Sequence, residues 1–137
     1  MKPPEEPIRS QVASWLAKAD DDYQLIERLA AEADEFPAIV AFHSQQASEK
    51  YIKALLVVHQ IDFPKSHDIK QLLALLRPAE PEAAAQLADA RWLTPFGAAM
   101  RYPGDYPELR PGDAQRAIET ARRVRTVVMA LLERCFR

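Results

Sequence analysis

The stretch A-F-H-S-Q-Q-A-S-E-K-Y-I-K-A-L-L, residues 41–56, has the periodicity of a helix with one apolar and one polar arc. With its flanking residues, the apolar arc comprises Val40, Ala47, Tyr51, Ala54, Leu55 and Val58. The polar arc comprises Gln46, Glu49, Lys50 and Lys53. Strong helix formers fill the segment and Asp62-Phe63-Pro64 breaks it, so we predict a helix over residues 38–60. Such a helix requires neighbours that cover its apolar arc.

Both ends of the chain supply long helices with an apolar stripe. A helix over residues 10–34 places on one side Val12, Leu16, Ala19, Tyr23, Ile26, Ala30 and Ala33. A last helix, with Asp113 as its expected N-cap, repeats the pattern with Ala114, Ala117, Ala121, Val124, Val128, Leu131 and Cys135. Steps of three and four residues keep such side chains on one face, as a bundle helix requires.

Prolines divide the middle of the chain into shorter elements. Ser66 is the expected N-cap of a short helix over residues 68–77, which ends before Pro78. A further helix is predicted over residues 81–100, and Pro95 should kink it or restart it after Thr94.

These elements predict an all-α fold, an up-and-down antiparallel helical bundle of four to five helices. No segment shows the period-two alternation of a strand, and the connections between the long helices are short. A chain of 137 residues is long enough for one domain with a core of its own. We therefore expect a bundle over residues 10–137, preceded by a flexible, proline-rich segment over residues 1–9.

Composition excludes several classes of function. The net charge of -2 gives no overall affinity for nucleic acid. The single cysteine, Cys135, allows no internal disulfide and fits a reducing cytoplasm. The three histidines are too scattered for a metal cluster, so we expect no metal and no cofactor. No apolar run approaches the roughly 20 residues that cross a membrane, so no membrane association is expected.

The charge is distributed unevenly. Residues 1–35 carry nine acidic and four basic side chains, whereas residues 110–137 carry seven arginines and three acids. One interpretation is a basic last helix that faces RNA. The interpretation we favour is that the first and last helices lie side by side and neutralise each other.

Few residues have the pattern of an enzyme site. The successive carboxylates Asp20, Asp21 and Asp22 point in different directions on a helix and should not share one site. Cys135 lies on an apolar stripe, which predicts a buried small side chain instead of a nucleophile. His67, in K-S-H-D-I, is either a general base beside Asp68 or, as we favour, a structural histidine near a helix cap.

A ridge on the second helix invites a binding role. His43 lies one turn before Gln46, and Lys50 and Lys53 continue along the same side. Two ammonium groups on one ridge could bind a phosphate. A solvated helix face explains the same pattern equally well.

Four motifs occur in an order that resembles the HEPN domain family of prokaryotes. They are A-F-H-S-Q-Q-A-S-E-K-Y-I-K-A-L-L, K-S-H-D-I-K-Q-L-L-A-L-L, R-Y-P-G-D-Y at residues 101–106, and A-I-E-T-A-R-R-V in the last helix. The resemblance spans nearly the whole chain. It implies an all-helical bundle that forms homodimers and pairs with a minimal nucleotidyltransferase, in the manner of a toxin–antitoxin module.

Many members of the HEPN family, which this chain resembles, are metal-independent ribonucleases. They use an Arg-x4-6-His motif. Here Arg101 is present, but Tyr106 stands five residues later and residues 102–137 contain no histidine. A tyrosine with a pKa near 10 is a poor base at neutral pH. We therefore predict a non-catalytic binding module that contacts nucleotide or RNA through Lys50, Lys53, Arg101, Tyr102 and Asp105.

The alternative is an atypical HEPN ribonuclease. Arg101 would stabilise the phosphate charge, and Tyr106 or His67 would replace the missing acid–base group. On either hypothesis R-Y-P-G-D-Y forms a turn, because Pro103 restricts Tyr102 and Gly104-Asp105 is ordinary turn chemistry.

Overall fold

Helices account for nearly all of the regular structure. The computed structural model describes residues 2–98, 104 and 107–137, and this part of the chain contains no strand. In order, its elements are α1 (Glu6–Leu29), the 3-10 segment η1 (Ala30–Glu35), α2 (Pro37–Val58), α3 (Ile69–Leu76), α4 (Pro81–Gln86), the 3-10 segment η2 (Ala88–Leu93), α5 (Thr94–Ala98) and α6 (Asp113–Cys135). The predicted all-α class is confirmed.

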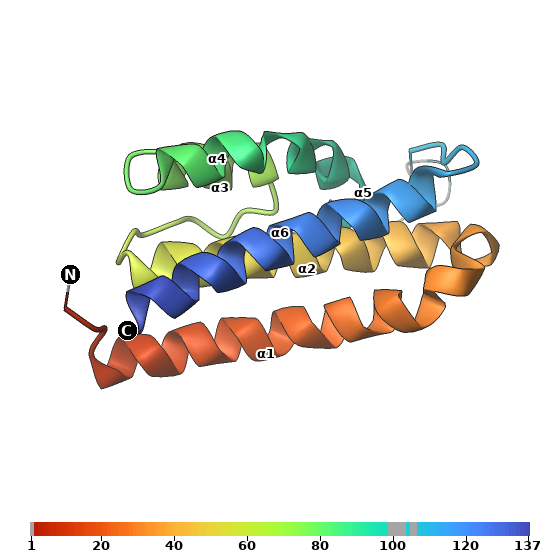
Figure 1. Ribbon diagram of the computed structural model, residues 1–137. Coiled ribbons are helices and arrows are strands. Elements are labelled where there is room, and N and C mark those ends of the chain that lie inside the picture. The colour runs from red at the N-terminus through yellow and green to blue at the C-terminus, as the bar shows by residue number, and fades with distance from the viewer. Residues whose placement is uncertain (1, 99–103, 105–106) are drawn as a thin grey trace.

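Three long helices, α1, α2 and α6, form the body of the bundle (Figure 1). The shorter elements α3, α4, η2 and α5 form a second layer beyond α2 and α6. α1 and the run from α4 to α5 point one way, and α2 and α6 point the other way. The up-and-down alternation is therefore present, and α2 and α6 run parallel where they pack together.

α2 is the central helix because it packs against both α1 and α6. Most of its second half is buried, with no exposed surface on Tyr51, Ile52, Ala54, Leu55 and Leu56. Glu49 and Lys53, which the sequence places on a polar arc, are also buried, at 2% and 5% exposure. The solvated-face interpretation is therefore wrong for Lys53, which the rings of Trp15 and Phe63 cover.

The predicted stripe of the first helix is confirmed, with Val12, Ala19, Ile26 and Ala33 buried. Its start is one turn earlier than predicted. α1 begins at Glu6, so residues 6–9 belong to the helix. Pro7 explains the difference, since proline suits the first turn of a helix, where its missing N–H is not needed.

Two predicted caps are wrong by one or two residues. α3 is capped by Asp68, whose Oδ1 accepts a hydrogen bond from the Lys70 N–H at 3.0 Å, while the Ser66 Oγ accepts from the Asp68 N–H at 3.1 Å. The N-cap of α6 is Gly112, at a φ of 91° that favours glycine. Asp113 is the first helical residue, and its carboxylate accepts from the Arg110 N–H instead.

The helix predicted over residues 81–100 is divided into α4, η2 and α5. The restart at Thr94 is confirmed, with Pro95 in the first turn of α5. An earlier break lies at Leu87, which leaves the helical region at φ -96° and ψ 5°. Residues 99 and 100 of the prediction lie outside the described residues.

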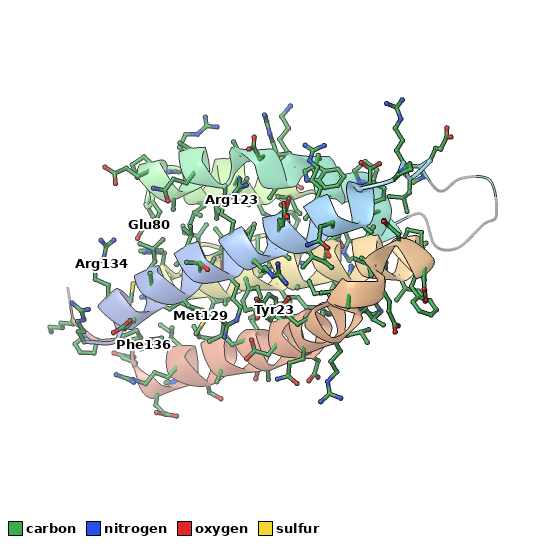
Figure 2. The ribbon with its side chains drawn as sticks, turned by 45° about the vertical axis from the view of Figure 1, so that its right-hand side comes forward. Tyr23, Glu80, Arg123, Met129, Arg134 and Phe136 are labelled. Atoms are coloured by element: carbon green, nitrogen blue, oxygen red, sulfur yellow. The ribbon has the colours of Figure 1, made fainter. Side chains whose placement is uncertain are left out.

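Ion pairs link three arginines of α6 to neighbouring elements. Arg122 pairs with Glu27 of α1 at 2.6 Å, which confirms for this pair that the first and last helices neutralise each other. Arg123 and Arg134 instead reach Asp89 in η2 and Glu80 beside α4, at 3.4 and 3.7 Å. Figure 2 shows these two arginines on the side of α6 away from Tyr23.

A buried tyrosine joins α1 to α2. The hydroxyl of Tyr51 donates a hydrogen bond to Asp20 Oδ1 at 2.5 Å, and its ring meets the ring of Tyr23 edge to face. Burial, followed by the hydrogen bond to Asp20, raises the pKa of Tyr51 far above its ordinary value of 10.

This raised pKa predicts a loss of stability at alkaline pH. A phenol whose folded pKa exceeds its unfolded pKa stabilises the fold fully below about pH 10, and this contribution falls as the pH rises toward the folded value. Above about pH 10, Tyr51 should therefore lower the free energy of unfolding by about 1.4 kcal/mol per pH unit. Urea unfolding of wild type and Tyr51→Phe along a pH series measures the difference. Equal slopes for the two proteins would contradict the assignment.

Candidate functional site

The carboxylate of Glu49 lies at the centre of a buried polar network. Its side chain is 3% exposed. Oε1 accepts from Gln45 Nε2 at 3.0 Å and lies 2.8 Å from His67 Nδ1, while Oε2 pairs with Lys53 Nζ at 2.9 Å. A carboxylate only accepts hydrogen bonds, so His67 serves as a donor here. Three donors offset the cost of removing this charge from water.

Local sequence explains how the network is assembled. Gln45, Glu49 and Lys53 follow one another at intervals of four residues and so lie on one face of α2. His67 reaches the same face from the segment between α2 and α3. The ammonium group of Lys53 also lies 5.3 Å from the ring centroid of Trp15 and 5.7 Å from that of Phe63. These ring faces attract the cation and shield it from water.

Gln45 extends the network to α5. Its Nε2 also donates to the backbone carbonyl of His67 at 3.2 Å, and its Oε1 accepts from Gln46 at 2.7 Å. Gly97 of α5 lies directly against this amide, and a Cβ there would overlap it. The glycine is therefore needed for the close approach of α5 to α2.

A second network surrounds Asp22, which joins α1 to α2. Its Oδ1 lies 2.7 Å from His43 Nδ1, and its Oδ2 lies 2.6 Å from Lys50 Nζ. Asp20 bonds Tyr51 instead, and Asp21 is exposed. The three successive aspartates serve separate purposes, in agreement with the prediction that they do not share a site.

The motifs that form these networks belong to a known family. A family model described as the HEPN domain matches residues 12–133. The chain belongs to the HEPN domain family. The match extends from the first turns of α1 almost to the end of α6, and it confirms the resemblance found in the sequence. Comparisons with curated proteins and with solved structures find no match.

This HEPN domain gives the predicted binding lysines carboxylate partners of its own. Lys50 pairs with Asp22 and keeps 21% of its side chain exposed. Lys53 pairs with Glu49 and is 6% exposed. The phosphate-binding ridge stays a prediction, and a phosphate there would have to compete with these carboxylates.

The remaining predicted site residues of the HEPN chain, Arg101, Tyr102, Asp105 and Tyr106, lie outside the described residues. Within that motif only Gly104 is described, in a turn at a φ of 96° that suits glycine.

Sequence reasoning missed Glu49 as the centre of a network and His59 as a bonded residue. His59 Nε2 lies 3.0 Å from Glu80 Oε1. The sequence did contain a signal for the network around Glu49, namely the four-residue spacing of Gln45, Glu49 and Lys53. The predicted burial of Cys135 is confirmed, since the residue is 5% exposed, and this burial raises the pKa of its thiol.

The described part of this HEPN domain shows neither a metal-binding cluster nor a membrane-spanning helix. Over residues 2–98, 104 and 107–137, no group of three or more histidine, cysteine or carboxylate side chains is arranged to hold a metal ion. Within the same ranges, no helix combines the length and apolar character needed to cross a membrane.

Proposed function

We propose that this HEPN domain is a non-catalytic binding and assembly module. It forms a homodimer and docks a minimal nucleotidyltransferase in a toxin–antitoxin-like pair. The observation that carries the proposal is that Tyr106 stands five residues after Arg101, while the histidines of the chain lie elsewhere, at His43, His59 and His67. Residues 102–137 supply no further histidine for an acid–base pair.

The start of α2 is the surface that we assign to the second copy. Phe36 and Ile39 are the large hydrophobic residues that the described part of the chain leaves exposed, at 41% each. They lie one helical turn apart, so a single partner can cover both. Family membership supports a second copy of the chain as this partner, since HEPN domains often dimerise.

Replacing Ile39 with aspartate should convert the dimer to a monomer, because a charge at an apolar interface loses its hydration without gaining a partner. Light scattering coupled to size-exclusion chromatography gives the mass of each species. Ala13→Asp, at an exposed position of α1, is the control and should stay dimeric. A monomeric wild type, or a dimeric Ile39→Asp protein, would rule out this interface.

The partner half of the proposal is tested by co-purification with the product of the neighbouring gene. Calorimetry with nucleotides tests the proposed nucleotide binding by Lys50, Lys53 and Arg101. Lys50 would exchange Asp22 for a phosphate, so Lys50→Met should weaken any such binding. A chain with no nucleotidyltransferase neighbour and no nucleotide binding would leave both halves without support.

One observation favours the alternative, an atypical metal-independent ribonuclease. His67 exposes 63% of its side chain while the buried carboxylate of Glu49 holds its Nδ1. A carboxylate that orients one ring nitrogen leaves the other for proton transfer. In this alternative, Arg101 stabilises the phosphate and His67 or Tyr106 moves the proton.

Incubation of total RNA with wild type, Arg101→Ala and His67→Gln separates the two functions. The ribonuclease hypothesis expects cleavage by the wild type alone. Equal cleavage by all three proteins indicates a contaminant, and no cleavage by any of them favours the non-catalytic module.

A further inference from the structure

A basic groove lies on the side of α6 away from α1. It has a volume of about 410 Å³ and is lined from α3, η2 and α6 by Lys70, Ala88, Asp89, Arg91, Trp92 and Arg116. Three of these six side chains are cationic, in a chain whose net charge is -2. The three cations come from three different elements, so the tertiary structure alone brings them together.

Arg116 is held in position at this groove. Its guanidinium lies over the ring of Trp92, 4.0 Å from the centroid. The Trp92 Nε1–H donates to the Thr120 Oγ1 at 3.2 Å, and that hydroxyl donates in turn to the Arg116 backbone carbonyl at 2.8 Å. Stacking of a guanidinium on an aromatic face fixes its plane and leaves its N–H groups available at the edge.

The positive charge in the groove is not neutralised by the protein. Among the described residues, no carboxylate lies within ion-pair distance of Lys70, Arg91 or Arg116. Asp89, the one acid of the lining, already pairs with Arg123 at 3.4 Å. By contrast, the cations of the two α2 networks, Lys50 and Lys53, both have carboxylate partners. The lining carries three cations against the one carboxylate of Asp89, and a surface with such an excess of positive charge attracts an anion.

We propose that this groove binds phosphate groups, carried either by a free polyphosphate or by the backbone of a nucleic acid. Arg116 forms the fixed contact, because a stacked guanidinium matches the geometry of phosphate oxygens. Lys70 and Arg91 supply the surrounding positive charge. The site is separate from the Lys50 and Lys53 surface and requires neither a dimer nor a nucleotidyltransferase.

Calorimetric titration with tripolyphosphate at low ionic strength tests the groove directly. Arg116→Gln should weaken binding about tenfold, since it removes a charge-assisted hydrogen-bond donor. Lys70→Gln should weaken it less, and both variants should lower the dependence of affinity on salt. Arg28→Gln removes the same charge from an exposed position on α1 and should bind like wild type.

The source of the phosphate is read from a second titration, in which a fluorescein-labelled oligouridylate replaces tripolyphosphate. If only tripolyphosphate binds, the ligand is a free polyphosphate. If the oligonucleotide binds, with or without tripolyphosphate, the groove binds the backbone of a nucleic acid. Circular dichroism shows that each variant is folded. The proposal is overturned if wild type binds neither probe, or if Arg116→Gln and Arg28→Gln bind equally well. The Ile39→Asp experiment is unaffected by either result, so the two proposals fail independently.

Discussion

Replacing Glu49 with alanine is expected to lower the free energy of unfolding by about 3–5 kcal/mol. The change removes the acceptor of three donors and leaves the ammonium group of Lys53 buried without a counter-charge. A protein of this size should then melt roughly 10 °C lower. Thermal and urea unfolding followed by circular dichroism measure both quantities.

Two controls separate the network from a general effect of losing a glutamate. Glu119→Ala, at an exposed position of α6, should change stability by less than about 0.5 kcal/mol. The double variant Glu49→Leu/Lys53→Met removes both charges together, so it should be clearly more stable than Glu49→Ala. If Glu49→Ala and Glu119→Ala unfold alike, the carboxylate of Glu49 does not hold this part of the fold together.

Replacing Gly97 with alanine is expected to cost about 1–3 kcal/mol, although alanine favours helices more than glycine does. The new methyl group would overlap the amide of Gln45. That amide cannot move freely, because Gln45 is fully buried and bonded to Glu49, His67 and Gln46. The overlap must separate α5 from α2 or break these hydrogen bonds.

A double-mutant cycle distinguishes the overlap from an intrinsic effect of the substitution. Gln45→Ala on its own should be destabilising, because it empties a buried position and leaves the Gln46 amide donor and the His67 carbonyl acceptor less well satisfied. Gly97→Ala in that background should then cost little, since space is available for the methyl group. Additive free-energy changes would show that the two side chains do not interact.

Helix positions were largely predictable from the sequence, because the apolar stripes of α1 and α6 depend only on local periodicity. Val12 and Ile26 in α1, and Ala117 and Val124 in α6, are buried as the pattern predicts. Helix ends were less predictable. The start of α1 depends on Pro7, and the division of the helix predicted from residue 81 onward depends on packing. In both places several helix boundaries have similar energies.

The candidate sites were predictable only in part. The motif around Glu49 identified the family, but its polar residues were expected to face water or a phosphate. Burial of Lys53 depends on Trp15 and Phe63, which reach it from other segments. The basic groove was not predicted, because Lys70, Arg91 and Arg116 are far apart in the chain and each alone resembles an ordinary exposed cation.

The sequence by itself determined that this chain is helical, that it belongs with the HEPN domains, and that a tyrosine, Tyr106, stands five residues after Arg101. These properties depend on residue identity and short-range spacing. Only the tertiary structure decided which charges of the described residues are paired within the protein and which are not. That outcome depends on distances between segments remote in the chain, and a buried carboxylate and an exposed one have the same letter in a sequence.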